Sequence, residues 1–206
     1  MDLCPELLTR IGEHLLLSAI ALSIGTLLGA GAGLWIWNKP RISGWVSGTA
    51  STLQTIPSLA LFAILLPFLG IGFLPAVTAL TLYAMLPVFR NTVTALRECP
   101  QELIDASSVC GMSSFQCLLY VQVPLGLPLL IAGIRTSAVW TVGSATLAAF
   151  IGAGGLGEFI NRGLALNDWH LLLLGAIPSA LLAIGVDLSL GALEKKMWRW
   201  KNGVAA

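Results

Sequence analysis

Long apolar runs separated by short polar stretches dominate the sequence. The run from Leu15 to Trp37 contains no charged residue and is long enough to cross a bilayer, which takes about 20 apolar residues as a helix. The run from Ile42 to Phe89 also lacks charge and is too long for one such helix. We expect its break at the glycine-rich stretch 70–75. The first half of the chain therefore predicts three spans, at about 15–37, 45–69 and 75–96.

Two more apolar runs follow a polar linker, at about 125–151 and 169–193. The pattern predicts an all-α, polytopic membrane protein with about five transmembrane helices, in a single domain covering residues 1–206. Prolines inside the second and third spans remove helical hydrogen bonds. We expect the freed carbonyls to face neighbouring helices or a water-lined path.

The first run carries a stripe of small residues. Gly25, Gly29 and Gly33 recur at every fourth position, which places them on one helix face and favours close packing against a second helix. The preceding stretch 1–13 is amphipathic. It is expected either at the membrane surface or as a frayed end.

The composition supports membrane insertion and narrows the chemistry. The chain is 56% hydrophobic and 10% charged, whereas soluble domains are about 25% charged. A net charge of +1 argues against a nucleic-acid partner. Its four cysteines lack the spacing of a metal site, so no metal or cofactor is expected. We expect His14 and His170 at membrane interfaces, and no signal peptide, because the N-terminus is not basic.

Basic residues predict the orientation, because they concentrate on the cytoplasmic side. Five spans place the two termini on opposite sides. With the linker and the C-terminus inside, ten of the eleven basic residues lie outside the membrane, and Arg135 lies within it. The cytoplasmic side then holds eight, namely Lys39, Arg41, Arg90, Arg97, Lys195, Lys196, Arg199 and Lys201, against Arg10 and Arg162 on the other. The N-terminus is predicted outside and the C-terminus in the cytoplasm.

The linker predicts two short helices with a glycine corner. Pro100 suits a first helical position, and Glu102 and Asp105 carry carboxylates near the positive end of the helix dipole. Gly111 suits a left-handed stop.

A second helix is expected immediately after that corner. Ser113 and Gln116 have the spacing of a capping box. Val123 precedes Pro124, which disfavours helix at that point.

Two opposite charges lie inside predicted spans. Arg135 is about ten residues into the fourth span, or ~15 Å at 1.5 Å per residue. Asp187 lies at a similar depth in the fifth. An isolated charge there is costly, so we expect the two to pair or to face a wet interior. Their role is either to fix helix packing or to line a translocation path.

The linker resembles a known family. Asp105-Ala106-Ser107, three residues, Gly111, nine residues and the Val121-x-Val123-Pro124 end resemble the EAA loop of ABC importer permeases, with Asp for Glu and Ser for Ala. The resemblance implies the fold of a type I importer permease. It also implies a cytoplasmic coupling helix in a loop at about 97–124, which docks an ATPase through Glu102, Asp105, Ala106, Ser107 and Gly111.

Two further stretches resemble one group of these permeases. Gln54-Thr55-Ile56-Pro57-Ser58 and Phe150–Gly157 are similar to segments of importers for glycine betaine, choline and carnitine, and the second also to methionine-type permeases. The resemblance implies a non-enzymatic subunit of a bacterial inner membrane transporter, which works by alternating access. Its implied partners are a separate ATPase, an external substrate-binding protein, a second permease chain and lipid.

Several alternatives stay open at this point. A phosphate-binding loop is absent from the sequence, so the chain is not expected to hydrolyse ATP by that route. A permease for methionine or another small solute, a stand-alone channel or secondary transporter, and a membrane scaffold would share the apolar pattern. Aromatic cages hold quaternary ammonium groups, but Trp140 and Phe150 need not converge. No ligand contact is assigned.

Overall fold

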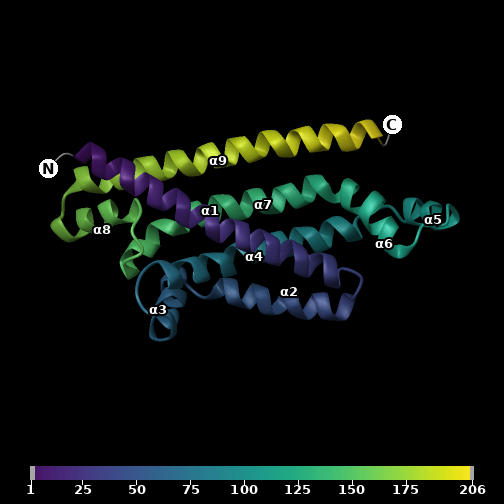
Figure 1. The fold of residues 1–206 in the computed structure, drawn as a ribbon, viewed down its shortest axis with the longest axis horizontal. Coiled ribbons are helices and arrows are strands. Elements are labelled where there is room, and N and C mark those ends of the chain that lie inside the picture. Colours follow the sequence, from purple (N-terminus) through teal and green to yellow (C-terminus); the bar gives the residue numbers. More distant parts are fainter. Residues whose placement is uncertain (1–2, 205–206) are drawn as a thin grey trace.

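The computed structural model describes residues 3–204, and every regular element in that range is helical (Figure 1). This confirms the predicted all-α fold. The elements are α1 (Leu3–Ile36), α2 (Pro40–Thr55), α3 (Ser58–Leu69), α4 (Phe73–Arg97), α5 (Gln101–Val109), α6 (Ser114–Cys117), the π-helix η1 (Leu118–Gln122), α7 (Val123–Ala145), the 3₁₀ helix η2 (Thr146–Ile151), α8 (Gly157–Leu166) and α9 (Trp169–Val204).

Helix α4 lies at the centre of the bundle. It packs along α1 on one side and along α7 on the other, and α9 packs along α7 at the outer edge (Figure 1). The largest buried side chains include Leu17 of α1, Phe62 of α3 and Leu80 of α4, which belong to one apolar cluster. Four helical stretches are long and apolar enough to cross a membrane, at 4–36, 73–97, 114–151 and 169–201, within the described chain.

The glycine stripe of α1 is the contact with α4, as predicted. A Cβ placed on Gly25 would lie 2.7 Å from Cβ of Ala84, and one placed on Gly33 would lie 2.6 Å from Cβ of Thr92. Both distances are shorter than a carbon–carbon contact allows. The two backbones can therefore approach this closely only because α1 has no side chains at these positions.

The predicted second span forms two helices, because one of the prolines inside it interrupts the helix. The chain breaks at Pro57, which gives α2 with 16 residues and α3 with 12. Pro57 has no N–H for the helix ladder, and its ψ of 136° is extended. The proline ring also disfavours helix at Ile56 before it. Hydroxyls on α2, including Ser51 and Thr52, bond to carbonyls of their own helix and stay exposed.

The predicted break in the helix before Pro124 is wrong, because helix continues from Ser114 to Ile151. A π-turn over 118–122 precedes the proline, and the N–H of Val123 donates to the carbonyl of Leu118, five residues back. A wider turn at this point lets the helix continue although Pro124 supplies no donor.

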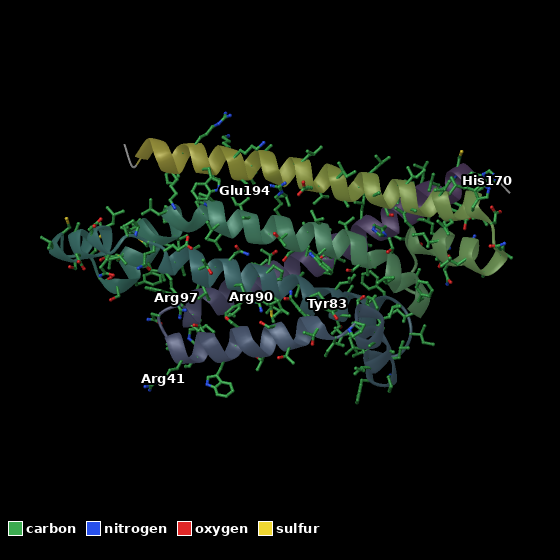
Figure 2. The ribbon with its side chains drawn as sticks, turned by 180° about the vertical axis from the view of Figure 1, so that it is seen from behind. Arg41, Tyr83, Arg90, Arg97, His170 and Glu194 are labelled. Carbon is green, nitrogen blue, oxygen red and sulfur yellow. The ribbon has the colours of Figure 1, made fainter. Side chains whose placement is uncertain are left out.

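The two ends of the bundle gather different segments. One end holds the start of α1 beside α8, whereas α5 and the C-terminus lie at the other (Figure 1). Figure 2 shows His170 at the first end, and Arg41 and Arg97 toward the second. The segments predicted on each side of the membrane are therefore together, although the side that each end faces stays a prediction. The amphipathic N-terminal stretch, within the described residues, is continuous with the first span.

Candidate functional site

The helix α5 is closed by its own backbone. Gly111 has φ of +78°, so the predicted left-handed stop is confirmed. The N–H of Gly111 donates to Ser108 at 3.0 Å and that of Met112 to Ser107 at 3.1 Å. These two bonds make a Schellman motif, which satisfies carbonyls at the end of the helix. Pro100 lies one residue before the helix, with ψ of 131°, rather than at its first position.

The next helix starts with the predicted capping box. The N–H of Gln116 donates to Oγ of Ser113 at 3.3 Å, and the N–H of Ser113 donates to Oε1 of Gln116 at 2.8 Å. Two donors at the start of α6 are thereby satisfied by two neighbouring side chains. The corner between α5 and α6 therefore keeps its shape through local bonds.

Four of the five predicted docking residues lie on the surface. Glu102, Asp105, Ala106 and Gly111 are exposed, whereas Ser107 is buried and donates its hydroxyl to the carbonyl of Ile104. Ser107 is thus not on the surface that a partner would meet.

Sequence reasoning missed two large apolar residues of this segment. Val109 is 87% exposed and Phe115 is 70% exposed. Val109 lies in the linker, and Phe115 lies at the start of the apolar stretch 114–151. Large exposed apolar patches mark contact sites with a protein or a membrane. Because both residues are close in sequence to the predicted docking residues, their exposure could have been predicted.

Arg135 and Asp187 form the ion pair that the sequence suggested. Nε and one terminal nitrogen of Arg135 bond both carboxylate oxygens of Asp187, at 2.7 and 2.8 Å, in a bidentate arrangement. Glu194, which sequence reasoning missed, accepts a third bond at 3.0 Å. A Cβ on Gly191 would lie 3.0 Å from Cζ of Arg135, so the glycine leaves room for the guanidinium. The group joins α7 to α9 with one positive and two negative charges.

A larger ionic network ties α1 to α8 at one end of the bundle. Arg10 contacts Glu13 at 2.9 Å and Glu158 at 2.5 Å, and Arg162 contacts Glu6 at 2.7 Å. Glu13 also accepts the N–H of Gly155 at 2.9 Å, from the glycine-rich loop that follows η2. Both arginines predicted on the outer side therefore belong to the same network.

His14 lies inside the bundle and does not reach its surface, so its expected contact with a membrane interface is not seen. Its side chain is fully buried, and Nε2 lies 3.0 Å from the carbonyl oxygen of Val142 on α7. The backbone of Gly155 packs against its ring, where a Cβ would lie 3.3 Å from Nδ1. His14 therefore packs between α1, α7 and the glycine-rich loop. His170 is exposed at the start of α9, and its place at a membrane interface stays a prediction.

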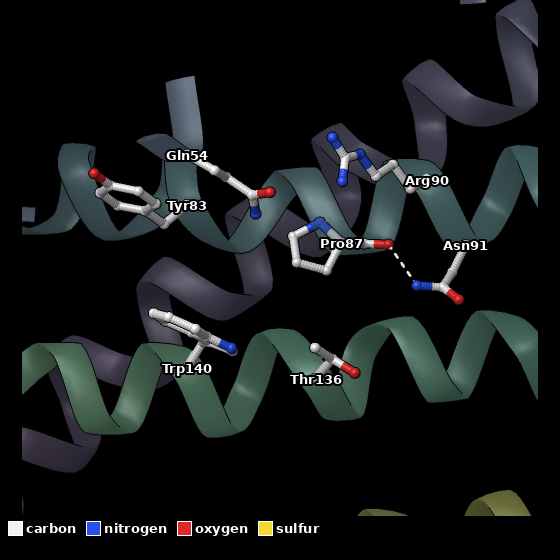
Figure 3. A pocket seen from close by; sticks show the side chains of 7 residues that line it. All are labelled: Gln54, Tyr83, Pro87, Arg90, Asn91, Thr136 and Trp140. Atoms are coloured by element: carbon white, nitrogen blue, oxygen red, sulfur yellow. Dashed lines mark hydrogen bonds between the residues drawn. The ribbon is translucent and has the colours of Figure 1, made fainter. Parts of the chain in front are cut away.

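A cavity of about 420 Å³ opens between α2, α4 and α7 (Figure 3). Its lining consists of Gln54, Tyr83, Pro87, Arg90, Asn91, Thr136 and Trp140. Sequence reasoning did not bring Tyr83 and Trp140 together, and it counted Arg90 among the residues outside the membrane. The structure places Arg90 inside α4, where it donates to the carbonyl of Ser47 at 3.3 Å and to the hydroxyl of Ser51.

The sequence matches one protein family over most of its length. Residues 25–199 match the family described as the binding-protein-dependent transport system inner membrane component.

Three curated relatives carry related names. The carnitine transport permease protein OpuCB of Listeria monocytogenes is 42% identical over 93% of this chain and 88% of its own length. The glycine betaine/carnitine/choline transport system permease protein OpuCB of Bacillus subtilis is 40% identical over the same shares. The osmoprotectant import permease protein OsmW of Salmonella typhimurium is 41% identical over 88% of this chain and 87% of its own.

Solved structures share the fold. An inward-facing structure of the MetNI methionine ABC transporter superposes with a TM-score of 0.84 at 21% identity, covering 93% of this chain and 95% of that one. An identity this low supports the fold and not the substrate. The family match and the relatives together identify this chain as a member of the family of inner membrane components of binding-protein-dependent transport systems.

Proposed function

We propose that this chain is the permease subunit of an importer for osmoprotectants such as glycine betaine, carnitine or choline. One observation carries the proposal: relatives about 40% identical over nearly the whole chain bear the names of permeases for these solutes. The structural likeness to a methionine transporter supports the architecture alone. A methionine permease is therefore the less favoured assignment.

In this proposal a separate ATPase subunit supplies the energy and docks at α5. Exposed Glu102, Asp105 and Ala106, next to exposed Val109 and Phe115, support such a contact. An external binding protein delivers the solute, and a second permease chain completes the path. Ala106→Glu would place bulk and charge on the contact, so we expect normal membrane abundance with less ATPase in a pull-down. A Gln101→Glu variant controls for the added charge at the start of the same helix.

The Arg135–Asp187–Glu194 group belongs to this path in the proposal. It lines a cavity of about 420 Å³ that also reaches Thr136 and Trp140, which line the cavity of Figure 3 as well. Charged groups at membrane depth are commonly found beside wet cavities, where water lowers the cost of the charge. The two cavities therefore share two lining residues on α7.

The proposed orientation is N-terminus outside and C-terminus in the cytoplasm. It is supported by the excess of basic residues toward the end that holds α5. A reporter fused after Ala206 should be active only if it functions in the cytoplasm. Activity of a periplasmic reporter at this position would contradict both the orientation and the docking assignment.

Uptake of radiolabelled solutes tests the function directly. Cells that lack their other osmoprotectant importers, and express this chain with its ATPase, binding protein and any second permease chain, should accumulate glycine betaine, carnitine or choline at high osmolarity. Accumulation should stop when the Walker lysine of the ATPase is replaced. Uptake of methionine alone would overturn the substrate assignment, and uptake without an active ATPase would indicate a channel or secondary transporter.

A further inference from the structure

The cavity between α2, α4 and α7 has two chemically distinct ends (Figure 3). Tyr83 of α4 and Trp140 of α7 lie at one end, on facing helices. Arg90 and Asn91 lie at the other, about two turns further along α4. The hydroxyl of Tyr83 donates to the carbonyl of Ile56 at 2.5 Å, which fixes its ring beside the break between α2 and α3.

Polar side chains in the lining of the cavity indicate that it contains water. Trp140 is 67% exposed and lies well inside a helical stretch that is long and apolar enough to cross a membrane. Around it are the guanidinium of Arg90, the amides of Gln54 and Asn91 and the hydroxyl of Thr136. A lipid-facing surface would place these polar groups in hydrocarbon at high cost, so they indicate a water-filled path.

The side chain of Arg90 keeps capacity for a ligand. Its recorded contacts are to Ser47 and Ser51 on α2, both made by one terminal nitrogen. A guanidinium has five N–H donors in a planar fork, so donors remain that can donate to a carboxylate. Arg90 is the one charged residue that lines this cavity, among the residues described.

A zwitterion matches both ends at once. Aromatic faces attract quaternary ammonium groups, and an arginine fork binds a carboxylate. We propose that this cavity is a binding site along the translocation path for carboxylated quaternary ammonium compounds, with the ammonium between Tyr83 and Trp140 and the carboxylate at Arg90. The proposal rests on the osmoprotectant function proposed above and deepens it. It assigns the permease itself a part in selecting betaines.

Selectivity of uptake tests the charged end. Choline carries the ammonium without a carboxylate, so Arg90→Gln should reduce uptake of glycine betaine relative to choline by roughly tenfold, the scale of one hydrogen bond to a charged group. Arg90→Lys should retain an intermediate ratio. An equal fall for both solutes, at unchanged membrane abundance, would overturn the proposed role of Arg90.

The aromatic end predicts a different pattern. Trp140→Ala should lower uptake of glycine betaine and choline alike, and Trp140→Phe should restore part of both, because a ring face is retained. Trp35→Ala is the matched control, since Trp35 is 73% exposed on α1 and lies outside the cavity. Full uptake by Trp140→Ala would contradict the proposal.

Direct protection separates this site from the function on which it rests. Thr136→Cys is made with the exposed Cys4 and Cys110 replaced by serine, which leaves only the buried Cys99 and Cys117. Glycine betaine at millimolar concentration should slow maleimide labelling of the new thiol several-fold in the purified permease, and glycerol at equal osmolarity should not. If cells import glycine betaine but the solute does not protect the thiol, the proposed function stands and the proposed binding site is wrong. Failure of the wild type to import any of the three solutes would reject the function itself.

Discussion

The two ends of the bundle are stabilised in different ways. At one end, charged side chains of α1 and α8 neutralise one another, and Arg10 alone contacts three carboxylates. At the other, α5 and α6 are held by hydrogen bonds within the segment, while Val109 and Phe115 stay exposed. The first end satisfies its polar groups across helices. At the second end, backbone hydrogen bonds are made within the segment, and side chains such as Val109 and Phe115 stay exposed to a partner.

The comparison shows how the short helix α5 keeps its shape with few buried apolar side chains. The Schellman motif at Gly111 and the capping box at Ser113 fix the corner through backbone groups. Substitutions on the exposed face should then change binding more than folding. Substitutions in the ionic network should do the reverse.

The largest effect is expected for Gly111→Asp. A side chain at φ of +78° is strained, so the corner between α5 and α6 should distort without contact with any span. We expect at least a tenfold loss of solute uptake with normal membrane abundance. Gly111→Asn is the control, because asparagine tolerates the left-handed region better and should retain more uptake. Full uptake by Gly111→Asp would show that transport does not depend on the shape of the corner between α5 and α6.

Arg10→Ala tests the ionic end. It leaves the carboxylates of Glu13 and Glu158 without their shared partner in a half-buried site. We expect a loss of about 1–3 kcal/mol in the free energy of unfolding, the usual scale for hydrogen bonds to charged groups. Thermal unfolding in detergent measures it, with exposed Arg41→Ala as the matched control. Equal stability of the two variants would show that the network does not hold this end.

A double-mutant cycle examines the ion pair between the ends. Arg135→Ala leaves two carboxylates facing each other, and Asp187→Ala leaves Arg135 with Glu194 alone. We expect the first change to lower the yield of folded protein more than the second. The double variant should recover part of the loss, because coupled residues are not additive. Strictly additive losses would mean that the contact does not stabilise the protein.

The smallest effect concerns thiol reactivity at the end of the bundle that holds α5. Cys110 is exposed beside Gly111, whereas Cys99 is buried and burial raises the pKa of its thiol. Only the thiolate reacts with maleimide, so the raised pKa and the burial of Cys99 should slow its labelling, and the exposed Cys110 should label faster. Added ATPase subunit should slow the labelling of Cys110 and leave the exposed Cys4 unchanged. Peptide mass spectrometry resolves the sites, and rapid labelling of Cys99 at neutral pH would contradict the packing.

Local patterns in the sequence predicted what depends on local chemistry. The glycine stripe, the left-handed Gly111 and the capping box each need only a few neighbouring residues, and each is confirmed. Proline was harder to interpret. Pro57 splits a predicted span, whereas the helix continues past Pro124 because a π-turn precedes it.

Contacts between distant segments could not be predicted in the same way. Glu194 bonds Arg135 where Gly191 lets α9 approach α7, and Tyr83 and Trp140 line one cavity because α4 packs against α7. Neither contact produces a periodic pattern of residues that a single sequence would show. The burial of His14 likewise depends on the glycine-rich loop, which folds back onto α1.

The π-turn before Pro124 also has a mechanical consequence. Because helix continues from Ser114, the corner next to Gly111 and the cavity residue Trp140 lie on one rod, about 39 Å apart at 1.5 Å per residue. A hinge at Pro124 would let the corner move while the rod stayed still. If the continuous helix moves as one body, a small rotation at the corner would displace Trp140 relative to Tyr83.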